Sequence, residues 1–378
     1  MLREVGFDVE VFERSETPLE GRGAGIVLHP ASVRHLTDVA GVDVGDIGAP
    51  ARVLRYEDRA GNVVHEEPCG YRFTSYFWLH QALLACFDRD RYHLGREVTA
   101  LEQDASGVTV EVDPGAPQRC ALLVFADGIH STGRQLLLPE VKPLYAGYVG
   151  WRGTVSEAEL SPATFDVLHE AITYFVTAGG HILAYPIPSL DGSLEPGRRL
   201  TNWVWYRNMR QGTELDELMT DVHGVRRSLS LAPGMVRRGA LDELRTTARR
   251  TLPPALAEMV AKTRDPFVQV VVDLEVSRMA FGRVCLIGDA AFALRPHAAA
   301  GTAKAAEDAW KLGEALGSRG RDVVAALHDW EPAQLALGRR ALARTRAAGR
   351  RSQFEGTWCP GDPLPFGLYE VGDSALPP

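Results

Sequence analysis

The sequence predicts an α/β protein in which one mixed domain, built from two distant segments, carries an inserted and largely antiparallel sheet domain. Apolar runs typical of buried strands alternate with helical patterns near both ends of the 378-residue chain. The centre is instead rich in aromatic and β-branched residues, which favour strands. Similar ends around a different centre indicate a discontinuous domain with one insertion. We expect the mixed domain to cover residues 1–144 and 263–350, the insertion residues 145–262, and an irregular tail residues 351–378.

The first segment predicts a series of short elements. An alternating stretch indicates a strand over Asp8–Glu13 after a stop at Gly6, and a helix is expected over Ala31–Val39. The stretch YRFTSYFWLHQALLACF contains a second helix with a periodic apolar face. GVTVEV and CALLVFADG indicate two further strands, the second apolar enough to be buried on both faces.

The central segment predicts the inserted sheet. YAGYVGWRGTV, ITYFVTAGGHILAYPIP and RLTNWVWYRN are rich in strand-forming residues, and Gly179-Gly180 sits where a hairpin turn belongs. Helical patterns then continue to about Lys262. PFVQVVVDLEV and RVCLIGDA return to the pattern of buried strands, and two long helices are expected to follow them.

Composition argues against several classes of protein. A formal net charge of −8 disfavours a protein that follows nucleic-acid phosphates. No apolar run approaches the roughly 20 residues that cross a bilayer, and no leader pattern opens the chain. The five cysteines are scattered without a CxxC pair, which favours free thiols over disulfides or a zinc site. We therefore expect a cytoplasmic protein without a structural metal and without a nucleic-acid or membrane partner.

Two strand ends carry residues that suit an extended nucleotide. Glu13 ends the first strand, where a carboxylate can accept both hydrogen bonds of a ribose diol, although a solvated charge is the simpler alternative. The strand in LLVFADGIHSTGR ends at Asp127-Gly128, where glycine permits a sharp turn or a close approach. Arg134 beyond it can pair with a phosphate. An ordinary turn after a strand is the alternative.

A third strand end shows the most specific pattern. In RVCLIGDAAFALRPHAAAGTAKAAEDA, Gly288-Asp289 closes an apolar run, and unusually small residues follow. Asp289 can hold a polyol hydroxyl, and Gly301-Thr302-Ala303 opens a helix whose N–H groups favour a negatively charged ring. Around Pro296 the small residues let a planar ring lie against the backbone. A helix packed tightly on a sheet is the alternative.

ADGIHSTGR and GDAAFALRPHAAAG together resemble the FAD-dependent aromatic-ring monooxygenases of the p-hydroxybenzoate hydroxylase fold. The likeness spans nearly the whole chain and is strongest, through YRFTSY, YAGYVGWRG, HILAYPIP and DELMTD, with members that hydroxylate dihydroxypyridines. It implies a Rossmann-like FAD-binding domain with an inserted substrate domain, and NAD(P)H as a transient co-substrate. It further implies that O₂, through a flavin hydroperoxide, hydroxylates an electron-rich ring such as 2,6-dihydroxypyridine.

The resemblance also implies roles for individual residues. Asp289 would hold the ribityl chain, Glu13 the adenosine ribose, and Asp127 the loop that serves the pyrophosphate and NAD(P)H. His80 stands where the wider family carries an arginine facing the phosphates, and a plain surface histidine is the alternative. The full set of implied cofactor-binding residues is Glu13, Arg14, His80, Asp127, Gly128, Arg134, Gly288, Asp289, Pro296, Gly301, Thr302 and Ala303.

In one respect the chain departs from the family pattern. Members begin with a strand and a G-x-G-x-x-G loop before a helix, whereas the corresponding helix end lies here at residue 2. GRGAGIVL, Gly21–Leu28, is no substitute because its G-x-G-x-G spacing leads into an apolar stretch rather than a helix. We expect the native product to be longer by roughly 20–30 residues, the size of an ordinary strand, loop and helix.

The substrate side offers fewer signals. A phenol or hydroxypyridine needs a base or a hydrogen-bond acceptor at its ring hydroxyl. His297, inside the predicted flavin loop, is the first candidate for that catalytic contact, and Tyr174 and Tyr185 are candidate pocket hydroxyls. Trp203 and Trp205 share one face, where both a pocket and a core role fit. Arg295 fits either a charge partner near the flavin or a solvated side chain.

Three readings therefore remain open at the level of function. The main prediction is a hydroxypyridine hydroxylase with a small aromatic substrate and O₂ as partners. A same-fold hydroxylase of another phenolic or secondary-metabolite ring is the first alternative. A flavin-less remnant that serves as a binding protein is the second, because the glycine loop is missing. The basic helix over Arg339–Arg351 fits a solvated face or a homodimer contact.

Overall fold

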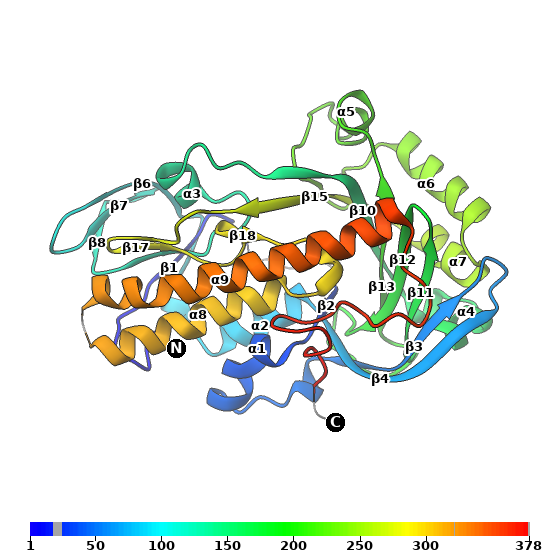
Figure 1. The fold of residues 1–378 in the computed structure, drawn as a ribbon, viewed down its shortest axis with the longest axis horizontal. Coiled ribbons are helices and arrows are strands. Elements are labelled where there is room, and N and C mark those ends of the chain that lie inside the picture. The colour runs from blue at the N-terminus through cyan, green and yellow to red at the C-terminus, as the bar shows by residue number, and fades with distance from the viewer. Residues whose placement is uncertain (18–24, 321, 377–378) are drawn as a thin grey trace.

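The computed structural model describes residues 1–17, 25–320 and 322–376, so Gly21 to Ala24 of the glycine-rich stretch lie outside the described residues. Figure 1 shows several small sheets at one end, a large sheet at the other, and the two long helices α8 (Gly301–Arg319) and α9 (Val323–Arg350) along the molecule. The predicted α/β class is confirmed. The expected closing pair of long helices is α8 and α9.

Small sheets occupy the end of the molecule that carries the N-terminus (Figure 1). The strand predicted over Asp8–Glu13 forms its hydrogen bonds only over its last three residues. Pairing is parallel for β1 with β5 and for β9 with β17, and antiparallel for β16 with β17 and within β6, β7 and β8. The strand bounds are β1 (Val11–Glu13), β5 (Tyr92–Leu94), β6 (Glu97–Gln103), β7 (Val108–Asp113), β8 (Gln118–Cys120), β9 (Leu123–Phe125), β16 (Ala280–Phe281) and β17 (Val284–Leu286).

A ten-stranded sheet forms the other end, in the order β14-β15-β10-β13-β12-β11-β3-β4-β2, with β18 paired to β15. The predicted hairpin is formed by β11 and β12, with Thr177 opposite Gly180. The strand bounds are β2 (Gly25–Val27), β3 (Ala49–Glu57), β4 (Val63–Ser75), β10 (Leu144–Ser156), β11 (Ala171–Thr177), β12 (Gly180–Ile187), β13 (Leu200–Asn208), β14 (Ser230–Leu231), β15 (Phe267–Glu275) and β18 (Phe292–Ala293).

This sheet extends beyond the predicted insertion at residues 145–262. On one side β3 pairs in parallel with β11, and on the other side β15 pairs antiparallel with β10. Strand pairing between distant segments leaves no local signal in the sequence, so the expected bounds of the mixed domain include β15 as well as β3 and β4, neither of which was predicted as a strand. The exact domain boundaries stay a prediction.

The two faces of the large sheet bury different residues. One face packs Trp151, Trp203 and Trp205 against a helical layer. Trp203 and Trp205, for which a pocket and a core role both fitted the sequence, therefore belong to the core. The opposite face carries five buried tyrosines, and we call it the tyrosine face: Tyr56, Tyr148, Tyr174, Tyr185 and Tyr206. The helices of the first layer are α4 (Pro162–Leu168), α5 (Thr213–Leu218), α6 (Arg238–Thr251) and α7 (Pro254–Lys262).

Three short helices complete the fold. The helix predicted over Ala31–Val39 is present as α1 (Pro30–Arg34), which continues into a π-helical turn over His35–Val39. The other two are α2 (Tyr76–Ala85) and α3 (Thr132–Leu137). Within the described ranges, no helix is both long and apolar enough to span a membrane.

Candidate active site

The ends of β9 and β17 lie side by side because these strands pair in parallel, with Phe125 opposite Leu286. Just past this pair, the Ile287 N–H donates to the Phe125 carbonyl oxygen at 3.0 Å. Asp127 and Asp289 follow the two strands closely. Parallel pairing therefore brings these sequence-distant carboxylates to one edge of the sheet, as the sequence predicted.

Arg134 connects the two loops that follow these strands. Its guanidinium donates to the carbonyl oxygens of Ala290 at 3.1 Å and Ile129 at 2.5 Å. Burial lowers the pKa of Arg134, while the nearby carboxylates of Asp127 and Asp289 act in the opposite direction. Its Nε atom is buried and has no partner among the described residues. Sequence reasoning predicted a phosphate partner, but its terminal nitrogens here bind backbone oxygens of both loops.

Asp289 is exposed at the surface but is crowded by neighbouring protein atoms. Its side chain reaches solvent, yet crowding by protein atoms raises its pKa to about 6, against the opposing charges of Arg134 and Lys304. The preceding Gly288 has φ +59°, and a Cβ on it would come within 3.0 Å of the Ala305 Cβ. Glycine is therefore required here by both conformation and space.

A buried ion pair in α8 holds the turn at Gly288 and Asp289 in place. Lys304 and Asp308 are both almost fully buried and pair at 2.5 Å within α8. The second oxygen of Asp308 accepts the Gly288 N–H at 3.0 Å. Helix α8 thus holds the backbone of the Gly288–Asp289 turn through a carboxylate that is neutralised inside the helix itself.

Glu13 lies near a residue that sequence reasoning missed. One of its carboxylate oxygens accepts the Ser15 N–H at 2.8 Å. Partial burial, together with the carboxylates of Glu13 and Asp289, raises the pKa of Tyr76 at the start of α2. Tyr76 therefore lies within electrostatic reach of both strand ends. The sequence signal for this position is Ser75, a typical N-cap residue, which predicts that a helix begins at Tyr76.

His80 follows Tyr76 by one helical turn and stacks on it, with ring centroids 6.1 Å apart. Burial lowers the pKa of His80, and its Nδ1 atom is buried with no partner in the described part of the chain. It is not the plain surface histidine of the alternative reading. Arg14 is exposed, and its charge helps burial to lower the pKa of His130.

The start of α8 has open space beside Gly301. Its N-cap residue, Ala300, makes no side-chain cap hydrogen bond. A Cβ on Gly301 would meet no described atom within 4 Å, and the same holds for Gly128. Pro296 begins a short 3-10 turn, and Gly301, Thr302 and Ala303 form the first turn of α8. A helix start leaves its first N–H groups without partners inside the helix, and these donors, with Asp289 and Glu13 at the strand ends, fit FAD.

His297 lies in the core rather than on the surface. Its Nε2 atom is 2.7 Å from the Tyr148 Oη, and its ring lies 4.9 Å from that of Tyr206 and 5.4 Å from that of His181. Burial, with a smaller effect of Arg295, lowers the pKa of His297 to about 3. A histidine with so low a pKa is a weak base, so a hydrogen-bonding contact is favoured over proton abstraction.

The two candidate hydroxyls are both buried in the tyrosine face. Tyr185 stacks on Phe73 with centroids 4.1 Å apart and donates its hydroxyl proton to the Gly25 carbonyl oxygen at 3.0 Å. Tyr174 stacks on Tyr56 at 5.3 Å. These contacts give each ring a packing role. Their catalytic roles stay predictions.

Two polar residues on the same face were missed by sequence reasoning. Arg152 is half-buried, and its charge lowers the pKa of Tyr185 and Tyr206 against the larger effect of burial. Asn202 pairs in register with Tyr185 and is buried. The Nε of Arg152 and the Nδ2 of Asn202 have no partner among the described residues. Alternation along β10 and β13 was the available signal, but aromatic residues on both faces obscured it.

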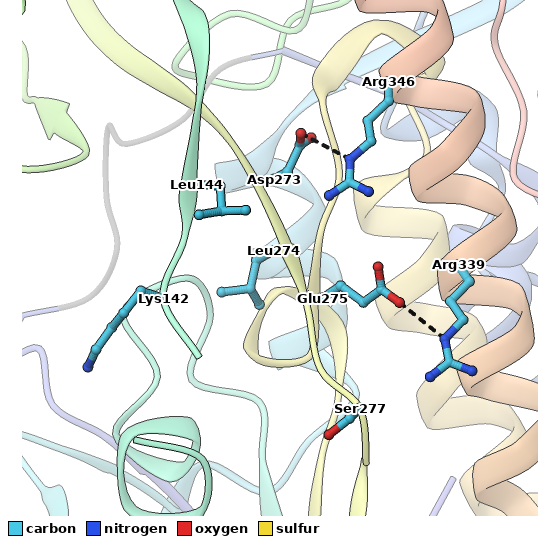
Figure 2. A pocket seen from close by; sticks show the side chains of 8 residues that line it. All are labelled: Lys142, Leu144, Asp273, Leu274, Glu275, Ser277, Arg339 and Arg346. Carbon is cyan, nitrogen blue, oxygen red and sulfur yellow. Dashed lines mark hydrogen bonds and ion pairs between the residues drawn. The ribbon is translucent and has the colours of Figure 1, made fainter. Parts of the chain in front are cut away.

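A separate pocket of about 330 Å³ opens on the outside of β15 and α9. Figure 2 shows Arg346 paired with Asp273 and Arg339 paired with Glu275. The nitrogen–oxygen distances of these ion pairs are 3.0 and 3.1 Å. From the interior, Arg295 makes a bidentate ion pair with Asp273 at 2.8 Å. Arg295 is therefore a buried structural partner rather than a solvated side chain. The lining residues are Lys142, Leu144, Asp273, Leu274, Glu275, Ser277, Arg339 and Arg346.

Comparison with known proteins gives consistent likenesses. Residues 258–345 match a model described as FAD binding domain, and residues 145–273 one described as FAD binding domain-like. The chain is 38% identical to the 2,6-dihydroxypyridine 3-monooxygenase of Paenarthrobacter nicotinovorans, over all of this chain and 94% of that protein. It is 29% identical to an FAD-dependent urate hydroxylase of Klebsiella pneumoniae, over 87% and 80% of the two chains.

Comparison with solved structures gives the same kinds of relatives. The TM-score is 0.90 with 2,6-dihydroxypyridine-3-hydroxylase from Arthrobacter nicotinovorans, at 37% identity over 98% of this chain and 93% of that one. It is 0.74 with Klebsiella pneumoniae HpxO complexed with FAD and uric acid, at 25% identity over 94% and 85%.

The fold and the site together define a flavin-dependent hydroxylase of aromatic rings. The chain belongs to the FAD-dependent aromatic-ring monooxygenases of the p-hydroxybenzoate hydroxylase fold. It is an enzyme whose cofactor is FAD and whose co-substrate is the NAD(P)H typical of the family. The predicted family, fold, cofactor and reaction class are confirmed, and the flavin-less alternative is not supported. The roles of single site residues stay predictions.

Proposed function

We propose that this enzyme hydroxylates a hydroxypyridine ring, with 2,6-dihydroxypyridine as the first candidate. The full-length identity of 38% to a relative named for that reaction supports the substrate class. The substrate would lie against the tyrosine face, next to the loop that carries His297. Its partners in the reaction would be O₂ and NADH or NADPH.

The observation that carries this proposal is a set of unpartnered polar atoms at the tyrosine face. Arg152 Nε, Asn202 Nδ2 and His297 Nδ1 are buried without a partner in the described chain. A buried polar group without a partner costs about 1–3 kcal/mol. A flat ring that carries oxygen and nitrogen atoms on its edge would supply partners while its faces contact tyrosine rings.

Each residue then has a distinct task in the reaction. When bound, FAD supplies the chemistry of O₂ activation after reduction by NAD(P)H. Arg152 would hold an anionic ring oxygen and so favour the electron-rich form of the substrate. Burial raises the pKa of Tyr206 to about 12, so its hydroxyl stays a neutral donor. His297 would contact the ring through a hydrogen bond, because its low pKa disfavours proton abstraction.

A substrate panel tests the proposal. FAD-loaded enzyme would be mixed with 2,6-dihydroxypyridine, 2-hydroxypyridine, 3-amino-4-hydroxybenzoate or urate, and oxidation of NADH and of NADPH would be followed with product mass. We expect 2,6-dihydroxypyridine to stimulate oxidation most and to gain one oxygen atom. Stronger stimulation and hydroxylation of a benzoate or of urate would contradict the hydroxypyridine assignment.

One alternative keeps specific support. Relatives at 27% and 29% identity are named for 3-amino-4-hydroxybenzoate and urate, so another phenolic or heterocyclic ring is the second candidate. We also propose a cytoplasmic location, supported by five free cysteines, and no nucleic-acid or membrane partner. A homodimer contact through the basic helix would use arginines other than Arg339 and Arg346, which pair with Glu275 and Asp273.

A further inference from the structure

The C-terminal tail is irregular but not peripheral. After Glu355 the described chain forms neither helix nor strand, yet it buries Trp358, Leu364 and Phe366 against the tyrosine face. The Trp358 ring lies 5.4 Å from Tyr174 and 4.7 Å from His181. In Figure 1 the tail, drawn in red, leaves α9, passes the strands of the large sheet and returns towards α1. Family models matched residues up to 345 only, so they assign nothing to it.

On its return, the tail binds the loop that precedes α8. The Gly367 N–H donates to the Ala298 carbonyl oxygen at 2.9 Å. Leu368 is buried in one small cluster with Ala298, Ala300 and Ala303. These alanines belong to the loop and first helical turn against which the flavin ring is predicted to lie. The tail therefore packs directly against the segment from Ala298 to Ala303.

The tail segment 366–373 is held in shape by a single carboxylate. One oxygen of Asp373 accepts the Leu368 N–H at 2.8 Å and lies 3.0 Å from His29 Nε2. Its other oxygen accepts the N–H groups of Tyr369 and Glu370 at 2.8 and 3.1 Å. Arg344 of α9 closes the arrangement by donating to the carbonyl oxygens of Gly367 and Leu368. Hydrogen bonds to a carboxylate are among the stronger ones in proteins.

The contacted loop needs such support. Ala299 has φ +51°, in the left-handed region that a non-glycine residue rarely adopts. A conformation of this kind persists only where neighbouring structure holds it. The Gly367–Ala298 hydrogen bond and the Leu368 contact act directly beside this residue.

We propose that tail segment 366–373 is a positioning element of the flavin site, with Asp373 as its positioning residue. Asp373 shapes the segment, the segment holds Ala298 to Ala300 in place, and that loop then accepts the flavin ring. This inference rests on the proposed placement of FAD against Pro296 to Ala303. The tail would then be a third part of the fold that shapes the flavin site, together with the tyrosine face and the strand ends.

Asp373→Asn tests the proposal, with Asp362→Asn as its control. Asparagine keeps the size of Asp373 but loses at least two accepted hydrogen bonds. Asp362 lies in the same tail and accepts the Cys359 N–H at 2.9 Å and an Arg351 donor at 2.7 Å, and neither partner belongs to the flavin loop. We expect FAD to bind Asp373→Asn about 10- to 100-fold more weakly, and Asp362→Asn within about twofold of the parent.

Two further readouts separate positioning from a general loss of stability. Amide exchange in FAD-free Asp373→Asn should rise at residues 298–304, and the visible flavin spectrum of the reloaded variant should shift. Since His29 also caps α1, His29→Asn keeps the cap while it removes one Asp373 contact, so it serves if Asp373→Asn fails to fold. We expect about threefold weaker FAD binding there, with the same rise in exchange.

The proposal is overturned if the variants release residues 366–376, by faster exchange, while FAD affinity and spectrum match the parent. Failure of the substrate assignment would look different. In that case the parent and Asp362→Asn would bind FAD equally well but leave 2,6-dihydroxypyridine unchanged, and the affinity loss in Asp373→Asn would still be measurable.

Discussion

Tyr148 and His297 are 149 positions apart in the sequence, yet the Tyr148 Oη and the His297 Nε2 lie 2.7 Å apart in the core. Tyr148 belongs to β10 of the large sheet, and His297 belongs to the loop between β18 and α8. This hydrogen bond connects the tyrosine face to the loop predicted to line the flavin. The proposed substrate and cofactor sides of the site thus share one buried contact.

Tyr148→Phe should show how much the Tyr148–His297 hydrogen bond contributes to the free energy of unfolding. The change leaves His297 Nε2 buried without a partner, which should lower the free energy of unfolding by about 1–3 kcal/mol. Tyr145→Phe is the control, because its hydroxyl donates to the Met209 carbonyl oxygen at 2.9 Å in a half-buried position. Urea unfolding of the FAD-free proteins measures both. Equal losses in the two variants would mean that the buried Tyr148–His297 pair has no special role in stability.

Asp289→Asn should weaken FAD binding. The carboxylate is predicted to accept hydrogen bonds from the ribityl chain, and a neutral amide is a weaker acceptor. We expect about a tenfold rise in the FAD dissociation constant, measured by flavin fluorescence. Asp265→Asn, on an exposed residue before β15, should leave the constant unchanged. An unaltered affinity in Asp289→Asn would remove this residue from the cofactor site.

The same variant should change how stability depends on pH. Desolvation raises the pKa of Asp289 to about 6 in the folded protein, above its ordinary value of about 3.9. Between these values the folded chain holds a proton that the unfolded chain has lost, so the free energy of unfolding falls as pH rises. Asparagine lacks this proton. Relative to the parent, FAD-free Asp289→Asn should therefore gain stability from pH 4 to pH 6.5 and no further above it.

Melting temperatures at pH 4, 5, 6 and 7 would measure this difference. The gain should grow with pH across the window and then level off. A gain that grows as the pH falls would show that the carboxylate is stabilised in the folded state, contrary to the raised pKa.

Arg152→Met should impair turnover of the substrate rather than cofactor binding. Losing a charged hydrogen-bond donor to an anionic ring costs about 1.5–3 kcal/mol, which corresponds to roughly a 10- to 150-fold fall in kcat/KM. Arg207→Met is matched to it, since Arg207 lies on β13 over the Trp205 ring on the opposite face. Steady-state oxidation of NAD(P)H with hydroxypyridine measures both. Equal effects would exclude a substrate contact for Arg152.

The strand ends were predictable because their signals are local. An apolar run that stops at Gly288-Asp289 or Asp127-Gly128 carries its own strand, turn and charge in a few residues. Parallel pairing of β9 with β17 then had to follow if both carboxylates served one ligand. The start of α8 was predictable for the same reason, since small residues around Gly301 are visible in the sequence.

Contacts between distant segments were not predictable in this way. Arg152 and Asn202 lie on strands whose two faces are both aromatic, so alternation alone did not separate a core face from a site face. The tail appeared merely irregular because its order comes from side-chain and backbone bonds such as those of Asp373. For His297 the sequence left open a base or a hydrogen-bond contact, because the burial that lowers its pKa depends on the tertiary structure.

Amide hydrogen exchange of the protein with and without FAD tests the proposed cofactor site most directly. If FAD lies along the two strand ends and the start of α8, it should protect residues 126–134, 287–291 and 298–305 and leave 238–262 in α6 and α7 unchanged. Saturating FAD that protects none of the three segments, or that protects the α6–α7 region instead, would contradict this placement of FAD.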